Sequence, residues 1–229
     1  LVRWGLDRLG RETTHQRNWR AQVLAFGEAG VQRWATLFAG TGGGVSYLPD
    51  ETFREEVWLA RAHAALYHGL PGLQPNTILL DLDEVVSHPT RFGELLGQLQ
   101  PERHNVIVAR ASAPPAVPGR IDVWWSGGGG NLALQLALVR SITSVRQWRR
   151  RPVRFHVPVD DTSQRRRLEH RFTRWLKDAR VKAELRAVES GDIERIAEIS
   201  GDAALTLLGL PDTTDAERFR ARVTPLVEG

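Results

Sequence analysis

Short runs of apolar residues alternate along this 229-residue chain with longer segments whose apolar positions recur every three or four residues. The runs are typical of buried strands, because a strand covered on both faces carries apolar residues without alternation. The recurring positions are typical of helices with one buried face. The predicted strands span residues 21–26, 45–48, 77–82, 105–109, 121–125, 153–157, 182–188 and 204–208. The predicted helices span residues 1–11, 31–38, 50–67, 89–99, 131–145, 163–180, 192–199 and 214–227.

This order of elements predicts the fold class. Strands that alternate with helices form an α/β fold with largely parallel sheets, because each connection returns along a covering helix. Residues 111–119 contain three prolines and are typical of a linker, so we expect two α/β halves. The expected domains are an amphipathic connecting helix at residues 1–17, a first α/β subdomain at residues 18–118 and a second at residues 119–229.

The composition restricts the chemistry. Cysteine is absent, which excludes disulfides, thiolate catalysis and cysteine-containing metal sites. A formal net charge of +4 is too small to predict nucleic-acid binding. No apolar run approaches the roughly 20 residues that a membrane helix needs, so we expect this stretch to be soluble. The chain begins at Leu1 and contains no methionine, from which we expect a fragment of a longer protein.

An acidic pair follows the third predicted strand. Asp81 and Asp83 have the spacing of the nucleophile and the proton-transfer group in haloacid dehalogenase-type phosphatases, with Asp160 and Asp161 as a possible metal-binding pair. However, two predicted strands precede Asp81, and both lysines of the chain follow Asp161, whereas such phosphatases need a lysine before it. We therefore interpret the pair as solvated carboxylates at a strand end and keep a phosphatase as the less favoured alternative.

Two glycine-rich runs occur, at residues 40–44 and 126–131. The second stands between a predicted strand and a predicted helix, where backbone N–H groups and the helix N-terminus can hold a phosphate. It is not a Walker A loop, because no Gly-Lys-Ser/Thr follows, and Trp124 occupies the position where a nucleophile elbow needs glycine. A tight turn is the simpler interpretation. The residues retained as a candidate for binding a nucleotide phosphate are Ser126, Gly127, Gly128, Gly129, Gly130 and Asn131.

The histidines and serines provide no catalytic set. Only His63 and His68 lie near the spacing of helical metal ligands, and they are five residues apart rather than three or four. No Ser/His/Asp set can be assembled from sequence order alone. We therefore expect no catalytic residue, no metal, no cofactor and no enzyme activity.

Arginines gather in two clusters of the second half: Arg146, Arg149, Arg150 and Arg151, and residues 165–167. Trp148 lies within the first cluster, which raises the question of nucleic-acid binding. Few aromatic residues are available to stack on bases, and arginines at helix ends are usually solvated. We expect a solvated face and no nucleic-acid partner, with anionic lipid headgroups as the second choice.

Four segments carry a more specific pattern: NWRAQVL at residues 18–24, PNTILL at 75–80, IDVWW at 121–125 before a leucine-rich helix, and ALTLLGLP at 204–211. In this order they resemble the cytosolic C-terminal domain of the cation–chloride cotransporters, which belong to the amino acid–polyamine–organocation transporters. Ala21 stands where that family has proline. Gly128 and Gly129 replace an acidic pair, so any contact made by those acids is not expected here.

The resemblance implies a fold similar to that of universal stress proteins and homodimerisation through this domain. It also implies a regulatory role at the cytoplasmic face of the membrane, with the chain's own transmembrane domain as partner. That membrane domain would transport chloride together with a cation such as potassium. The arginine excess in residues 1–20 is typical of the cytoplasmic side of a membrane helix. A nucleotide-sensing module similar to universal stress proteins is the alternative function, ahead of the phosphatase.

Overall fold

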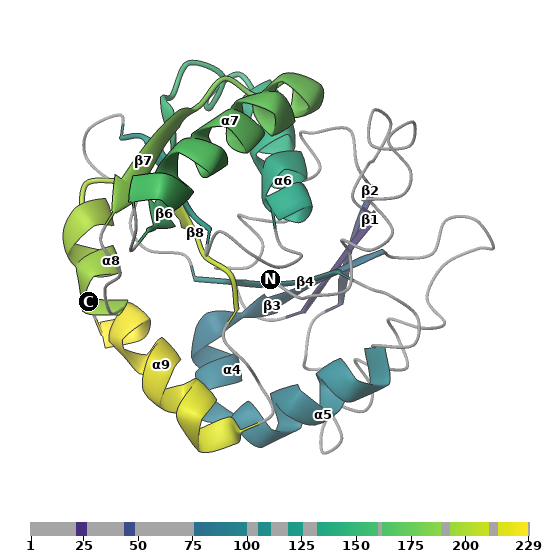
Figure 1. Ribbon diagram of the computed structural model, residues 1–229. Coiled ribbons are helices and arrows are strands. Elements are labelled where there is room, and N and C mark those ends of the chain that lie inside the picture. The colour runs from purple at the N-terminus through teal and green to yellow at the C-terminus, as the bar shows by residue number, and fades with distance from the viewer. Residues whose placement is uncertain are drawn as a thin grey trace. The chain divides into compact units, whose positions relative to one another are not determined.

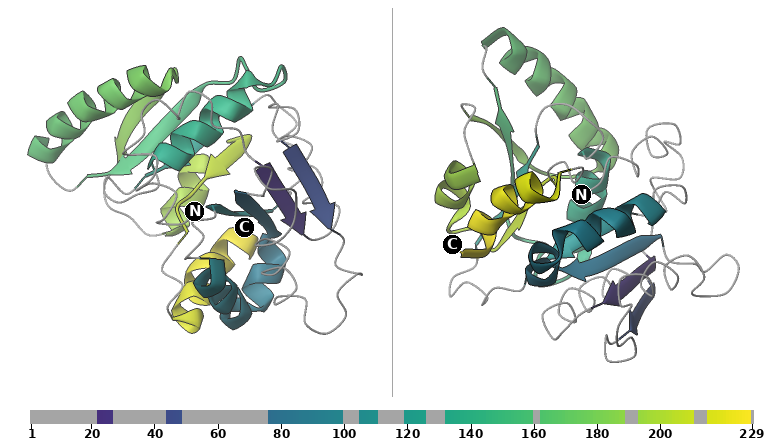
Figure 2. Two further views of the ribbon diagram at one scale, coloured as in Figure 1. Left: turned by 90° about the vertical axis from the view of Figure 1, so that its right-hand side faces the viewer. Right: turned by 90° about the horizontal axis from the view of Figure 1, so that it is seen from below.

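The computed structural model of the chain describes residues 22–26, 44–48, 76–99, 105–110, 119–125, 132–159, 162–188, 193–210 and 215–228. The chain divides into two compact units, and each is an α/β structure (Figures 1 and 2). The first unit takes in Trp19–Ser112 and Leu210–Glu228. The second unit takes in Ala113–Gly209.

The first unit contains a parallel sheet of four strands in the order β2-β1-β3-β4. These strands are β1 (Gln22–Phe26), β2 (Gly44–Leu48), β3 (Thr77–Asp81) and β4 (Asn105–Ala109). The first four residues of β3 are all fully buried, as expected for a central strand that is covered on both faces. Two helices, α4 (Leu82–Ser87) and α5 (Pro89–Leu99), follow β3 and precede β4.

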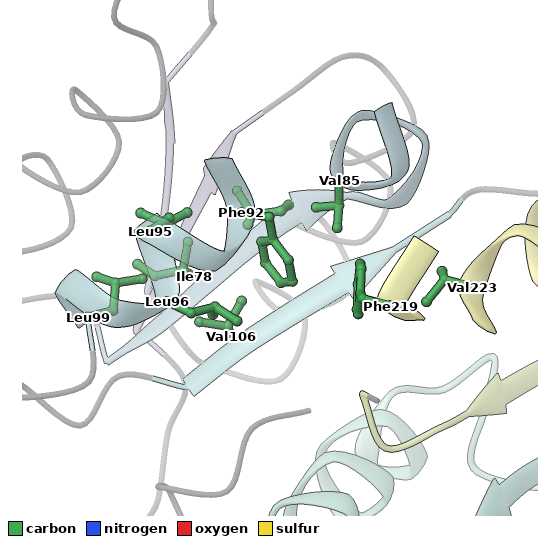
Figure 3. Packing of buried hydrophobic residues seen from close by; sticks show 10 residues of the cluster. Ile78, Val85, Phe92, Leu95, Leu96, Leu99, Val106, Phe219 and Val223 are labelled. Atoms are coloured by element: carbon green, nitrogen blue, oxygen red, sulfur yellow. The ribbon is translucent and has the colours of Figure 1, made fainter. Parts of the chain in front are cut away.

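A helix from the C-terminal end of the chain completes the core of this unit. Phe219 and Val223 of α9 (Ala216–Glu228) are buried among side chains of β3, β4, α4 and α5 (Figure 3). The ring centroids of Phe219 and Phe92 are 5.6 Å apart. The buried residues of this cluster are Ile78, Leu80, Val85, Phe92, Leu95, Leu96, Leu99, Val106, Phe219 and Val223.

The second unit contains a parallel sheet in the order β7-β6-β5-β8. Its strands are β5 (Ile121–Trp124), β6 (Val153–Pro158), β7 (Glu184–Val188) and β8 (Leu205–Leu207). Its helices are α6 (Leu132–Ser144), α7 (Thr162–Ala179) and α8 (Ile193–Ser200). The strands β5, β6 and β7 follow one another in one direction across the sheet, and the chain then returns past β5 to β8. Because the connections are right-handed, α6 and α7 lie on one face of the sheet and α8 lies on the other.

The two faces of this sheet differ in chemistry. Trp125 and Phe155 contact Phe172 of α7, with ring centroids 6.3 and 4.9 Å from it, so the face toward α7 is aromatic and apolar. Asp122 and Trp124 stand at alternate positions of β5 and therefore point to the opposite face, toward α8. A polar site thus lies on the α8 face of the second sheet.

The predicted α/β fold with parallel sheets is confirmed. Two details differ from the sequence-based expectation. No helix was expected between the third strand and Pro89, but α4 begins at Leu82, because the Asp81 carboxylate accepts hydrogen bonds from the N–H groups of Asp83 and Glu84. The helices expected at residues 1–11, 31–38 and 50–67 lie outside the described residues.

The second difference concerns the C-terminal helix. The sequence predicts one subdomain at residues 119–229, but α9 belongs to the first unit. The physical reason is the apolar stripe of α9, whose members Phe219 and Val223 are at most 2% exposed in the core of that unit. The first unit is therefore built from two separate parts of the chain.

Candidate functional site

The glycine-rich turn predicted to hold a phosphate comprises Ser126, Gly127, Gly128, Gly129, Gly130 and Asn131, and it lies outside the described residues. The elements on either side of it are described. β5 ends at Trp124 and α6 begins at Leu132, so the turn connects the carboxyl end of a strand to the start of a helix. β5 lies between β6 and β8, where the strand order reverses, and open α/β sheets commonly bind ligands at such a position. The nucleotide site remains a prediction.

Two buried polar atoms lie next to that turn in the sequence. The Gln135 side chain of α6 is fully buried and donates a 2.9 Å hydrogen bond to the carbonyl oxygen of Trp124. Gln135 Oε1 and Trp125 Nε1 are buried, and neither has a hydrogen-bond partner among the described residues. Within the described residues, the carboxyl end of β5 therefore has one buried acceptor and one buried donor without a partner.

The acidic pair of the first unit has local structural partners. Asp81 caps α4, and Asp83 forms an ion pair with Arg110 at 3.4 Å. No group of three or more histidine or acidic side chains in the described parts of the chain has the arrangement of a metal site. Asp160 and Asp161 lie outside those parts. Asp81 and Asp83 thus have structural roles at the end of the strand, Asp81 as a helix cap and Asp83 in an ion pair.

The clearest polar arrangement is a cluster around Asp122, which is fully buried on β5. Arg120 Nε donates to both carboxylate oxygens, at 2.8 and 3.0 Å. Ser200 Oγ, at the end of α8, donates to Oδ2 at 2.9 Å. His156 of β6 places Nε2 3.3 Å from the same oxygen. The Asp122 carboxylate therefore joins two strands and a helix, and we call this set of side chains the Asp122 cluster.

Arg120 extends the Asp122 cluster toward the segment between α8 and β8. Its Nη1 donates to the Asp202 carboxylate at 2.6 Å, and its Nη2 donates to the carbonyl oxygen of Ile199 at 2.7 Å. The Ile199 carbonyl is in the last turn of α8, where a cation is favoured by the helix dipole. A single guanidinium group thus fixes the end of α8 against the start of β5.

The charges in the cluster stabilise one another. Burial would raise the pKa of Asp122, but the polar contacts with His156, Arg120 and Ser200 outweigh burial and hold that pKa below its usual value. The hydrogen bond from Arg120 likewise lowers the pKa of Asp202. The hydrogen bond to Asp202 raises the pKa of Arg120. Asp122 is therefore ionised at neutral pH despite its burial.

The structure brings a serine, a histidine and an aspartate together, but not in the order of a catalytic triad. In a triad the serine hydroxyl donates to histidine, and histidine donates to the carboxylate. Here Ser200 donates directly to Asp122, and Trp124 Nε1 donates to Ser200 Oγ at 3.0 Å. Ser200 and His156 are 7% and 2% exposed, so a substrate does not reach them. The Asp122 cluster has the geometry of a structural cross-link.

His156 is held mainly by stacking. Its ring lies parallel to that of Trp124, with centroids 4.7 Å apart and an interplanar angle of 15°. Neither Nδ1 nor Nε2 makes a hydrogen bond of good geometry among the described residues, although Nε2 lies 3.3 Å from Asp122 Oδ2. The flat contact and the nearby carboxylate together compensate for burying a polar ring in this position.

Sequence reasoning missed the Asp122 cluster. The sequence pattern predicts Asp122 only as part of an apolar strand, and it indicates no role for Arg120, His156 or Ser200. One signal was available, since an aspartate between Ile121 and Val123 must either be buried with partners or interrupt the strand. The identity of those partners depends on contacts between residues up to 82 positions apart.

The arginine clusters are only partly described. The turn that follows α6 carries exposed Arg146, Arg149 and Arg150. Residues 165–167 belong to α7, but their side chains lie outside the description.

No helix in the described part of the chain combines the length and the apolar character that a membrane span requires.

Comparison with models of known protein families gives no match for this chain. Comparison with curated proteins likewise gives no match.

Proposed function

We propose that this chain is the regulatory and dimerisation domain of a secondary transporter similar to the cation–chloride cotransporters. In this proposal the domain lies at the cytoplasmic face of the membrane and is attached to the transporter's membrane domain. It catalyses no reaction of its own. The transported ions, chloride and a cation such as potassium, bind in the membrane domain and not here.

One observation carries the proposal: the four family-like segments fall on two pairs of neighbouring strands. Residues 18–24 lead into β1 and residues 75–80 form the start of β3, and β1 pairs with β3. Residues 121–125 contain β5 and residues 204–211 contain β8, and β5 pairs with β8. Segments far apart in sequence thus become paired strands, the central pair in the first sheet and the pair of β5 with the edge strand β8 in the second, as motifs that specify a common scaffold would.

The Asp122 cluster supports a scaffold rather than an enzyme. Its carboxylate, hydroxyl and guanidinium groups are engaged with one another and hold α8 to the sheet. A rigid unit of this kind can transmit a change of position to an attached domain. Such coupling needs contacts that differ between two states of the transporter, and a dimer offers an interface where those contacts can differ.

Light scattering on the 229-residue chain tests the dimerisation on which this role depends. The expected mass at tens of micromolar is twice the 25.7 kDa of one chain. Dilution should shift the mass toward that of the monomer, since dimer stability depends on concentration. A mass of one chain throughout this range contradicts the proposal.

A nucleotide-sensing module is the second candidate. It is favoured by Gln135 Oε1 and Trp125 Nε1, which are buried beside the predicted phosphate turn and have no hydrogen-bond partner among the described residues. Titration calorimetry with ATP, ADP and AMP distinguishes the two functions. Heat of binding from any of the three supports nucleotide sensing. No heat from all three at millimolar concentration removes that candidate and leaves the transporter domain.

A further inference from the structure

The turn between α6 and β6 concentrates positive charge. Residues 123–159 contain arginines at positions 140, 146, 149, 150, 151 and 154 and no aspartate or glutamate. Arg146, Arg149 and Arg150 are exposed. We call residues 145–151 the basic turn.

The basic turn has a defined shape. The N–H groups of Trp148 and Arg149 both donate to the carbonyl oxygen of Val145 at 3.0 Å, and Arg151 N donates to that of Trp148 at 3.0 Å. The Arg151 guanidinium lies over the Trp148 ring, 4.6 Å from its centroid, and donates to the Gly119 carbonyl oxygen at 3.0 Å. A preformed turn loses little conformational entropy when it binds a partner.

The charge of the basic turn is not neutralised within the described residues. Glu184, at the start of the neighbouring strand β7, pairs with Arg154 and Arg186. Asp202 pairs with Arg120. Among the residues that the structure describes, no carboxylate lies within ion-pair distance of the basic turn.

A second loop adds to this charge at the same edge of the sheet. β6 and β7 are paired, with Arg154 opposite Glu184, so the segments that precede them are neighbours. The segment before β7 carries exposed Arg180 and Lys182, and Lys177 is exposed in the last turn of α7. The amino edge of the second sheet therefore presents cations from two adjacent loops.

We infer that the amino edge of the second sheet is a docking surface for anionic phospholipid headgroups. A group of exposed arginines on adjacent loops is typical of surfaces that meet anionic phospholipid headgroups. The Trp148 side chain does not favour nucleic acid as the partner. The Arg151 guanidinium lies over the Trp148 ring and the indole Nε1 of Trp148 is buried, so the ring is not open for base stacking. Docking of this surface to lipid does not require a dimer.

Partition of the 229-residue chain into vesicles tests this inference. Vesicles of phosphatidylcholine with roughly one-third phosphatidylglycerol should bind the chain, and binding should weaken as salt is raised. Arg146→Ala with Arg150→Ala should reduce partition about 25-fold, because each cation near an anionic surface contributes about fivefold. Arg218→Ala with Arg222→Ala removes the same charge from the exposed face of α9 and should change partition about twofold at most.

Gln147→Glu provides a second test, because Gln147 is exposed and the substitution adds an acid to the basic turn without removing an arginine. It should reduce partition about fivefold.

Equal binding to vesicles of phosphatidylcholine alone, or equal losses in both arginine double variants, overturns the inference. Tighter binding to an oligonucleotide than to vesicles, with the same dependence on Arg146 and Arg150, also overturns it and assigns the surface to nucleic acid. Partition without dimerisation would refute the proposed function alone, and dimerisation without partition would refute this inference alone.

Discussion

The two units build the same kind of sheet and complete it by different means. In the first unit, α9 reaches the sheet from the far end of the chain and is held by apolar packing, with Phe219 against Phe92. In the second unit, α8 is held to β5 by the Asp122 cluster, in which a buried charge is surrounded by hydrogen-bond donors. Apolar packing tolerates a change of shape better than a change of volume, whereas a buried charge requires every one of its partners.

This contrast predicts different failures in the two units. Removing volume should damage the first unit most, and removing charge or crowding the backbone should damage the second. Hydrogen exchange can follow β3 and β5 separately, because local stability differs between cooperative parts of a protein.

Phe219→Ala should lower the unfolding free energy of the first unit by about 4 kcal/mol, because a fully buried phenylalanine leaves a cavity. Amides of β3 should exchange much faster, and those of β5 should change little. Phe219→Leu keeps most of the volume and should cost about 1.5 kcal/mol or less. Equal acceleration in both strands would show that the units do not differ as proposed.

Asp122→Ala should lower the unfolding free energy of the second unit by about 3 kcal/mol, because it removes the acceptor of Arg120 Nε and of the buried Ser200 hydroxyl. Amides of β5 should exchange faster while those of β3 keep their rate. Ser200→Ala removes one donor and should cost about 1 kcal/mol. A neutral effect of Asp122→Ala would mean that the cluster does not hold α8 in place.

Gly119→Ala should lower the unfolding free energy of the second unit by about 2 kcal/mol. A Cβ atom at this position would lie 2.7 Å from both the Ala204 nitrogen and the Asp202 carbonyl oxygen, and both are backbone atoms that cannot easily move. Gly97→Ala is the matched control, because a Cβ atom there meets no atom within 4 Å. That control should be neutral or slightly stabilising, since alanine favours a helix.

Acid should destabilise the second unit through Asp122. Its pKa is lower in the folded chain than in the unfolded one, so the ionised carboxylate stabilises the fold above the unfolded value of about 3.9. That stabilisation is lost as the pH falls through the folded pKa. Urea unfolding between about pH 6 and pH 3 should therefore show a shrinking difference between the wild-type chain and Asp122→Ala. A difference that stays constant over this range would contradict the assignment.

The fold could be predicted because its strands are nearly continuous apolar runs, such as Thr77–Asp81, and its helices carry apolar stripes. The placement of α9 could not be predicted. The apolar stripe with Phe219 and Val223 shows which face of the helix is buried, but it does not show which sheet that face packs against. Likewise, Asp122 is visible in the sequence as a charge in an apolar strand. Its partner Ser200 is 78 residues away and is specified only once α8 packs on the sheet.

The central claim is that this chain acts as one domain of a membrane transporter, and fractionation of the native protein tests it most directly. An antibody raised against the 229-residue chain should detect a protein much larger than 25.7 kDa in the membrane fraction. That protein should remain there after an alkaline carbonate wash, which releases proteins held only by charge to lipid headgroups. A protein of about 25.7 kDa that the wash releases, or that is found in the soluble fraction, would contradict the claim.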